Sequence, residues 1–221
     1  MSKRILMVVT TADTMNEGHK TGLWLSEFGE AYVEFEKRGY QITVASPLGG
    51  KAPVDERSLE GGETPQKILD TAKYLEDTEK LEKIVGASTF DAIFMPGGHG
   101  TMFDLPENDK LQHLIREFYE SNKIVASVCH GPAGLVGVTL SDGTPLVSGK
   151  TMTAFTDDEE RETTLDQFMP FLLESRLRLL GANVVTKENW AEHMQIDGNL
   201  ITGQNPQSTT MVAKEVTKKL S

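Results

Sequence analysis

The chain contains one cysteine, Cys129, at the end of an apolar segment. Residues 124–128 predict a buried strand, and Gly131 and Pro132 after the cysteine are typical of the first turn of a helix. A side chain on such a strand-to-helix elbow is exposed beside free backbone amides, as a nucleophile requires, and the helix start predicts a lowered thiol pKa. Counting residues alone leaves open the alternative that Cys129 is a small buried core residue.

A glycine-rich turn follows another predicted strand. Residues 91–95 predict the strand, which runs directly into PGGHGT at residues 96–101. The turn lacks both the GxGxxG spacing of a dinucleotide site and the GK[ST] ending of a P-loop, so we reject both interpretations. Ligands of open α/β sheets bind outside the carboxyl ends of the strands, where this turn and Cys129 both lie. We therefore predict that the amides of Gly98 and His130 hold a developing oxyanion, although glycines also simply permit positive φ in a tight turn.

Strand-like and helix-like segments alternate along the 221 residues. Strands are predicted at residues 4–10, 41–46, 91–95, 123–128, 151–155 and 183–186, with a hairpin at 194–203. Helices are predicted at residues 22–37, 75–85, 108–121, 171–180 and 208–220. This alternation predicts a single α/β domain over residues 1–221, with a doubly wound, mainly parallel sheet and helices on both faces, as in flavodoxin-like folds.

Charge and composition exclude several classes of function. A formal net charge of −11 would repel a phosphate backbone, so we predict no nucleic-acid partner. One cysteine cannot form an internal disulfide or a multi-thiolate metal site. The apolar run near the N-terminus is too short for a signal peptide or a membrane span, so we expect a cytoplasmic protein without a membrane partner.

The other histidines offer little evidence for a metal. His19 and Glu17 are two possible ligands in a polar loop, whereas three are the usual minimum, and we predict no catalytic metal. His113 is predicted to be solvated on a helix face. His99 could either line the mouth of a pocket or serve only as a turn residue, and we assign neither of these two histidines a catalytic role.

Five segments that span nearly the whole chain resemble the ThiJ/PfpI superfamily, the cysteine-elbow relatives of class I glutamine amidotransferases. They are GHKTGLWLSE, PGGHGTMFDLP, VASVCHGPAGL, GKTMTAFTDDEE and DGNLITGQNPQS. The CHGP elbow indicates the superfamily only, whereas the KTG segment with its glutamate and the FTxxEE segment point to the heat-shock chaperone and glyoxalase III branch. The amidotransferase HxE motif is absent, since His193 is the only histidine after the elbow region, and this disfavours glutamine hydrolysis.

The resemblance implies roles for particular residues. Cys129 corresponds to the nucleophile, His130 to its immediate neighbour, and Glu27 to the carboxylate that contacts the sulfur and serves as an acid and base. Without the resemblance, Glu27 would be interpreted as a solvated helix residue. Partial burial beside a thiolate would raise its pKa, as proton transfer near neutral pH requires.

A third carboxylate is expected in the acidic segment after Phe155. The resemblance matches Glu160 best, with Glu159 and Asp157 as alternatives, although a run of acids is usually a solvated surface.

The activity implied by the resemblance is that of a glyoxalase III-type lyase. Such an enzyme converts methylglyoxal and related 2-oxoaldehydes to 2-hydroxy acids through a cysteine hemithioacetal, without glutathione or any cofactor. The family also implies a homodimer. Two alternatives stay open: a stress-related holdase chaperone that binds unfolding proteins, and a cysteine-dependent amidase, peptidase or deglycase.

Overall fold

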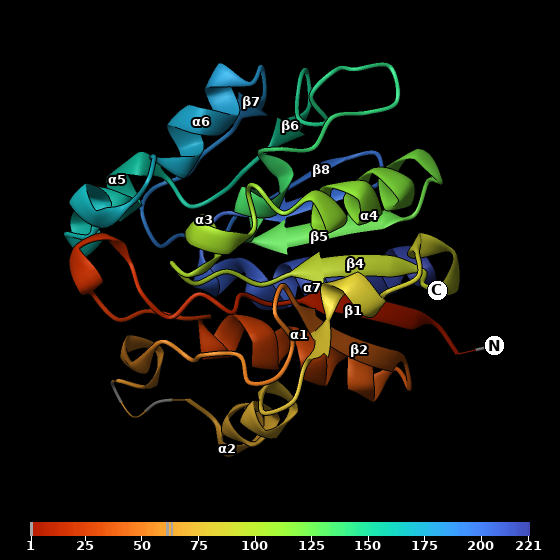
Figure 1. Cartoon of the computed structure of the whole chain (residues 1–221), viewed down its shortest axis with the longest axis horizontal. Helices are drawn as coiled ribbons and strands as arrows, with labels where there is room; N and C mark the ends of the chain where they lie inside the picture. Colours follow the sequence, from red (N-terminus) through yellow and green to blue (C-terminus); the bar gives the residue numbers. More distant parts are fainter. Residues whose placement is uncertain (1, 61, 63) are drawn as a thin grey trace.

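The computed structural model describes residues 2–60, 62 and 64–221, and its centre is a seven-stranded sheet (Figure 1). The strand order is β3-β2-β1-β4-β5-β9-β8, and a separate two-stranded sheet pairs β6 with β7. The strands are β1 (Arg4–Val8), β2 (Gln41–Ser46), β3 (Glu79–Lys80), β4 (Ala92–Met95), β5 (Ile124–Val128), β6 (Thr151–Met152), β7 (Asn183–Val184), β8 (Met194–Asp197) and β9 (Leu200–Gly203). All neighbours are parallel except β8 and β9, which form the hairpin that the sequence predicts.

Seven α-helices and several short 3₁₀ helices connect the strands in the described residues. The α-helices are α1 (Leu25–Lys37), α2 (Gln66–Leu69), α3 (Thr101–Asp104), α4 (Asp109–Glu120), α5 (Asp157–Thr163), α6 (Leu173–Leu179) and α7 (Thr209–Leu220). The 3₁₀ helices are η1 (Asn16–Gly18), η2 (Glu56–Leu59), η3 (Asp70–Leu75), η4 (Leu81–Lys83), η5 (Ala87–Thr89), η6 (Gly131–Leu135), η7 (Asp166–Phe168) and η8 (Pro206–Ser208).

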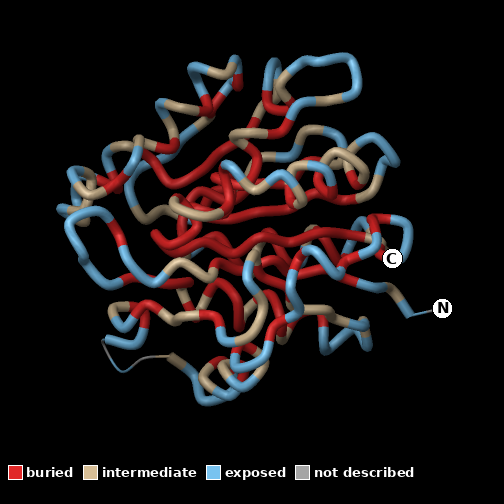
Figure 2. The backbone as a smooth tube through the Cα atoms, viewed as in Figure 1, coloured by how far each residue is buried: buried red, intermediate tan, exposed pale blue. Residues whose placement is uncertain are grey.

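The sheet is buried on both faces, which explains why its central strands are continuously apolar. In β1, Ile5 and Met7 belong to one apolar core, together with side chains of α1 and α7. Leu6 and Val8 point the opposite way and belong to a second core, together with α4. Figure 2 shows the resulting band of buried strands through the middle of the molecule. The predicted doubly wound α/β fold is confirmed.

The order of the strands positions the site. From β1 the chain passes to β2 on one side, whereas β4 and β5 lie on the other side, so the strand order switches direction between β1 and β4. In open α/β sheets, ligands bind at such a switch point, outside the carboxyl ends of the strands. The segments that follow β1, β4 and β5 are therefore the ones expected to form the site.

The predicted helix at residues 75–85 is wrong. This segment contains β3 and η4 instead. Its apolar side chains serve two different cores, because Leu75 packs with α1 whereas Leu81 and Ile84 pack on the opposite face of the sheet. The apolar spacing therefore comes from a chain that passes around the sheet edge, not from one face of a helix.

The first predicted helix begins later than expected, at Leu25 instead of Gly22. Leu23 is extended, and its amide donates a hydrogen bond to the carbonyl of Pro53 at 2.9 Å. The strands predicted at residues 151–155 and 183–186 are also shorter than expected, since β6 and β7 each contain two residues.

Candidate active site

Cys129 follows β5 on a sharp elbow, with a φ of 60° that side chains other than glycine rarely adopt. Two backbone hydrogen bonds hold the elbow. The Cys129 amide donates to the Gly203 carbonyl at 3.0 Å, and the Phe155 amide donates to the Cys129 carbonyl at 2.9 Å. The position of the cysteine on a strand-to-helix corner is as predicted, but its exposure is not, because only 3% of the residue is accessible to solvent.

The thiol begins a chain of hydrogen bonds. Cys129 Sγ lies 3.4 Å from His130 Nδ1, and His130 Nε2 lies 2.5 Å from Glu160 Oε2. Burial raises the pKa of Glu160, but the imidazoles of His130 and His99 lower it more, so that its pKa lies well below the usual range. Glu160 is therefore an anion that accepts hydrogen bonds at neutral pH. A cysteine, a histidine and a carboxylate in this order form the arrangement of a nucleophile, its base and the group that orients the base.

The neighbouring acid Glu159 is buried but points away from the histidines. It closes a capping box at the start of α5, where the Thr156 side chain accepts from the Glu159 amide and Glu159 accepts from the Thr156 amide. Its other oxygen accepts from the Trp190 amide at 2.8 Å, from Gln204 at 3.1 Å and from Asn205 at 2.9 Å. Glu159 thus joins α5 to the segments that follow β7 and β9, and none of its hydrogen bonds in the described residues is to His130.

Asp157 likewise lies outside the hydrogen-bonded chain. Its carboxylate accepts from the side chain and the amide of Ser175 in α6. Of the three acids considered from the sequence, Glu160 is the one that meets His130.

Glu27 lies in the first turn of α1 and is fully buried. Its Oε2 accepts a hydrogen bond from the Gly97 amide at 2.5 Å, whereas Oε1 has no hydrogen-bond partner among the described residues. Burial raises the pKa of Glu27 to about 8, although the hydrogen bond from the Gly97 amide and the nearby Cys129 thiol act in the opposite direction. Glu27 is therefore mainly a protonated carboxylic acid at neutral pH, and the interpretation as a solvated helix residue is wrong.

The thiol pKa differs from the sequence-based expectation. Burial and the nearby Glu27 raise the pKa of Cys129 well above its ordinary value, while the His130 amide acts in the opposite direction. No hydrogen bond of normal geometry joins Cys129 to Glu27, yet each shifts the pKa of the other. The predicted lowering of the thiol pKa is wrong because η6 is only one short turn, whose dipole is small beside the effect of burial.

His99 belongs to the site, which the sequence alone did not establish. It lies in the turn after β4 and is only 5% exposed. Its Nε2 is 2.6 Å from Glu160 Oε1, and the centres of the His99 and His130 rings are 4.2 Å apart. Burial and the neighbouring His130 lower the pKa of His99, so it is a neutral imidazole at neutral pH. The one available signal was its position directly after a central strand, at the edge of the sheet where ligands bind.

The glycine-rich turn packs tightly against the elbow. A Cβ atom at Gly97 would lie 2.6 Å from the His130 amide nitrogen, and one at Gly98 would lie 2.4 Å from the Gly22 carbonyl oxygen. Gly98 also has a φ of 103°, so this turn requires glycine. In the part of the chain that the structure describes, neither the Gly98 amide nor the His130 amide donates a hydrogen bond of normal geometry. The role of both amides as oxyanion donors stays a prediction.

Cys129, His130, His99 and Glu27 line a small pocket with a volume of about 50 Å³. The thiol, the two imidazoles and Glu27 form its polar part, and its apolar walls are Trp24, Phe155, Trp190 and Pro206. Because one water molecule occupies roughly 30 Å³ in the liquid, this space suits a molecule of a few heavy atoms.

His99, His130 and Glu160 also lie close enough together to suggest a metal site. The ligand atoms of His99, His130 and Glu160 are all within 4.8 Å of one another. However, each histidine nitrogen is 2.5 or 2.6 Å from a Glu160 oxygen. Ligands of a tetrahedral metal at about 2.0 Å would lie roughly 3.3 Å apart, so these are hydrogen-bond distances.

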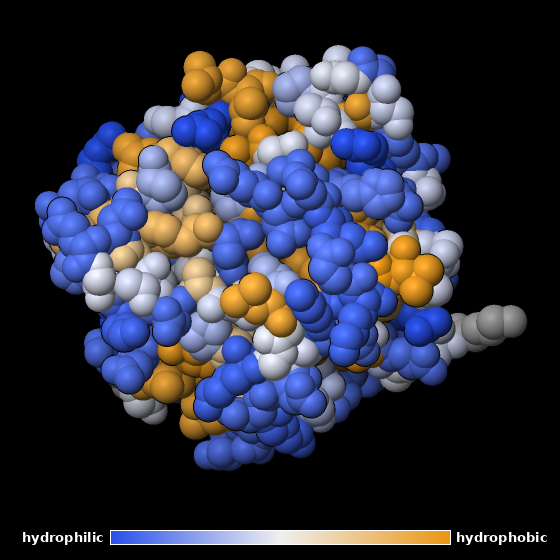
Figure 3. All heavy atoms as spheres, in the orientation of Figure 1, coloured by the Kyte–Doolittle hydropathy of each residue, from blue (hydrophilic) through white to orange (hydrophobic). Residues whose placement is uncertain are grey.

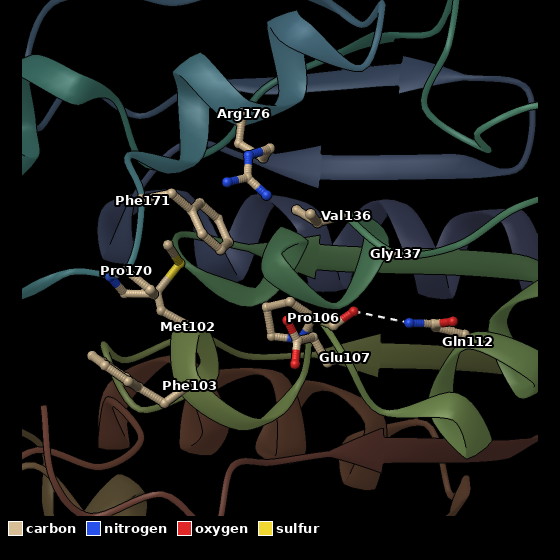
Figure 4. Close-up of a pocket in the computed structure, with 10 residues that line it drawn as sticks. All are labelled: Met102, Phe103, Pro106, Glu107, Gln112, Val136, Gly137, Pro170, Phe171 and Arg176. Carbon is tan, nitrogen blue, oxygen red and sulfur yellow. Dashed lines mark hydrogen bonds between the residues drawn. The ribbon is translucent and has the colours of Figure 1, made fainter. Parts of the chain in front are cut away.

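A larger cleft, of about 540 Å³, has a different set of lining residues (Figure 4). Its walls come from α3, from residues 170–171 and from α6, and the Arg176 guanidinium lies 4.2 Å from the centre of the Phe171 ring. On the face shown in Figure 3, apolar side chains gather between α3 and α6, and most of the remaining surface is hydrophilic. None of the residues proposed for catalysis lines this cleft, so its size does not make it the active site.

The fold and the cysteine elbow agree with the comparisons to known proteins. The sequence pattern of the DJ-1/PfpI family matches residues 19–219, and the chain belongs to this family. It is 32% identical to the glutathione-independent glyoxalase HSP31 of Saccharomyces cerevisiae, over 96% of this chain and 95% of the relative.

Two solved structures extend the comparison. One, which carries no functional name, is 52% identical, with a TM-score of 0.94 over 100% of this chain and 98% of the other. The crystal structure of glyoxalase III from Candida albicans is 28% identical, with a TM-score of 0.89 over 98% of this chain and 96% of the other. The described residues contain no helix of sufficient length and apolarity to cross a membrane.

Proposed function

We propose that this protein is a glutathione-independent glyoxalase that converts methylglyoxal and related 2-oxoaldehydes to 2-hydroxy acids. Relatives with this activity in their names match nearly the whole chain. The observation that carries the proposal is the buried pocket in which Cys129, His130 and Glu160 form a hydrogen-bonded chain and a protonated Glu27 adjoins the thiol. Such a pocket combines a nucleophile with a group that can donate and accept a proton near neutral pH.

The first step is addition of the thiol to the aldehyde carbon. His130 Nδ1 takes the thiol proton as the bond between sulfur and carbon forms, and Glu160 stabilises the resulting imidazolium. The aldehyde oxygen becomes an oxyanion beside the amides of Gly98 and His130. Glu27 then donates its proton to this oxygen, which gives a neutral hemithioacetal and leaves Glu27 as a carboxylate.

The second step moves hydrogen between adjacent carbons. The Glu27 carboxylate removes the proton from the former aldehyde carbon, and the His130 imidazolium protonates the neighbouring carbonyl oxygen to give an enediol. Glu27 returns its proton to the second carbon while the hydroxyl on the first carbon gives its proton back to His130. The product is a thioester of a 2-hydroxy acid, an isomer of the hemithioacetal, so no external oxidant or reductant is needed.

The third step is hydrolysis of the thioester by water. A bond forms between water oxygen and the acyl carbon, the bond between carbon and sulfur breaks, and the His130 imidazolium protonates the departing sulfur. The second proton of water passes to the Glu27 carboxylate, so that the thiol, His130 and Glu27 all return to their starting states. The sum of the steps is the 2-oxoaldehyde plus water giving the 2-hydroxy acid.

The decisive experiment is incubation of the purified protein with methylglyoxal in the absence of glutathione, with lactate as the measured product. We expect turnover by the wild type and none by Cys129→Ala. Glu27→Gln should lose turnover while Cys129 still forms a hemithioacetal that can be trapped and detected by mass spectrometry. Absence of lactate with the wild type, or full activity of Cys129→Ala, would refute the proposal.

The sequence-based predictions of one domain, a homodimer and a cytoplasmic location stay predictions. Size-exclusion chromatography with light scattering would test the homodimer directly.

A further inference from the structure

His99 carries a nitrogen without a partner. Both oxygens of Glu160 accept from histidine Nε2 atoms, Oε2 from His130 and Oε1 from His99. Because Glu160 is ionised, it can only accept hydrogen bonds, and each imidazole must therefore carry a hydrogen on Nε2. His99 is neutral, so its Nδ1 is left as a lone-pair acceptor.

The Nδ1 atom of His99 is buried and makes no hydrogen bond within the part of the chain that the structure describes. Leaving a buried acceptor unpaired costs on the order of 1–3 kcal/mol, and such groups are uncommon in folded proteins. His99 lines the same pocket as Cys129 and Glu27. A ligand or water in that pocket, with a hydrogen to donate, is therefore the expected partner of Nδ1.

The two histidines differ in what their Nδ1 atoms face. His130 Nδ1 lies beside the sulfur at 3.4 Å, where it serves the thiol proton. His99 Nδ1 has no such partner, although the same carboxylate supports both rings. The proposed reaction has one step, the attack of water on the thioester, that still requires a base.

We propose that His99 is the catalytic base of thioester hydrolysis, through its unpartnered Nδ1, with Glu160 as the carboxylate that orients both imidazoles. This inference rests on the proposed glyoxalase function. Nδ1 accepts a proton from water as the oxygen of water adds to the acyl carbon, and Glu160 stabilises the His99 imidazolium that forms. When the tetrahedral intermediate collapses, Cys129 leaves as a thiolate that takes the proton of the His130 imidazolium, and the proton held by His99 passes to the Glu27 carboxylate. Acid and thiol are released with no net change in protons or electrons.

Two substitutions distinguish a catalytic role of His99 Nδ1 from a role in which His99 only donates a hydrogen bond to Glu160. His99→Gln places its amide nitrogen near the position of Nε2, so it can still donate to Glu160 but has no group at Nδ1. His99→Asn places an amide near the position of Nδ1 but cannot reach Glu160. His113→Gln is the matched control, because the His113 side chain is 58% exposed on α4 and is not among the residues that line the pocket.

The experiment mixes each variant with methylglyoxal and follows both lactate and the intact mass of the protein. For His99→Gln we expect lactate formation to fall roughly 100-fold while the lactoyl thioester on Cys129 accumulates, since loss of a general base costs about 10²–10⁴-fold. In the wild type, protonation of His99 should lower kcat at acidic pH. The residual kcat of His99→Gln should not show this decrease. His113→Gln should match the wild type in every measurement.

Near-normal turnover by His99→Gln together with a loss in His99→Asn would show that His99 only supports Glu160, and would overturn the inference. Slow turnover by His99→Gln without an accumulated thioester would also overturn it, because His99 would then act before hydrolysis. Circular dichroism melting and alkylation of Cys129 establish that each variant is folded with an intact site. Failure of the proposed function itself is distinguishable, because the wild type would then form no lactate.

Discussion

Glu27 should lower the stability of the folded protein as the pH rises. Its pKa is about 8 in the folded state, against 4.5 for an ordinary glutamate. Between these two values the unfolded chain has released the proton and the folded chain has kept it, so unfolding is coupled to proton release and becomes easier with each increase in pH. The contribution is present in full below pH 4.5 and is lost as the pH rises toward 8. Glu27→Gln removes this dependence, because glutamine has the shape of the protonated acid and can still accept from the Gly97 amide.

The magnitude follows from the pKa. One pH unit of difference corresponds to 1.36 kcal/mol, so the full shift is worth about 5 kcal/mol. Deprotonation of Glu27 in the unfolded chain should lower the free energy of unfolding of the wild type by about 1 kcal/mol at pH 5 and about 4 kcal/mol at pH 8, and Glu27→Gln should escape this loss. Any constant cost of burying the glutamine amide cancels when the two pH values are compared. The variant should therefore gain about 3 kcal/mol on the wild type across this range while it loses turnover.

Urea unfolding of both proteins at pH 5, 6, 7 and 8 measures this difference. The exposed residue Glu82 offers a matched control, and Glu82→Gln should follow the wild type at every pH. If the free energies of unfolding of the wild type and Glu27→Gln change in parallel from pH 5 to pH 8, the carboxyl group is not held protonated. Its assignment as the proton donor to the hemithioacetal would then be refuted.

Three further substitutions test the framework of the site. Glu159→Ala removes the acceptor of the Trp190 amide and one acceptor each of the Gln204 and Asn205 side-chain amides, and it should destabilise the protein by about 3 kcal/mol in urea unfolding, whereas an unchanged midpoint would contradict the role given to Glu159. Gly98→Ala forces a Cβ atom to within 2.4 Å of a carbonyl oxygen and should cost on the order of 3 kcal/mol and abolish turnover; a stable, active variant would contradict the tight packing of the turn. Trp190→Ala removes one apolar wall of the pocket and should raise kcat/KM for phenylglyoxal relative to methylglyoxal, and an unchanged ratio would show that this wall does not limit substrate size.

The general position of the site could be predicted from the sequence. A buried strand that ends in Cys129, and another that ends in a glycine-rich turn, place both segments at the same edge of a parallel sheet. The strand pattern and the parallel topology are sufficient for this prediction, and both follow from the sequence. Glu27 required the family resemblance, since nothing in the helix pattern distinguishes a buried acid in its first turn from a solvated one.

The sequence of the acidic segment after Phe155 contains a signal that distinguishes Glu159 from Glu160. Thr156 followed three residues later by Glu159 is the pattern of a capping box, which commits Glu159 to the helix start and leaves Glu160 to face the histidines. His99 is different, because the direction of a side chain within a turn depends on backbone angles that local sequence does not determine. Its contact with Glu160, 61 positions away, appears only when β4 and α5 are brought together.

The state of the thiol has a consequence for survival under oxidative stress. Peroxides react with thiolates, and the sites most readily oxidised to sulfenic acid are exposed cysteines with a low pKa. Cys129 has the opposite properties, since it is 3% exposed and its pKa is raised by burial and by Glu27. In the proposed reaction it becomes a nucleophile as its proton passes to His130. We therefore expect peroxide to oxidise the resting thiol slowly, which the intact mass of the protein after peroxide treatment would measure.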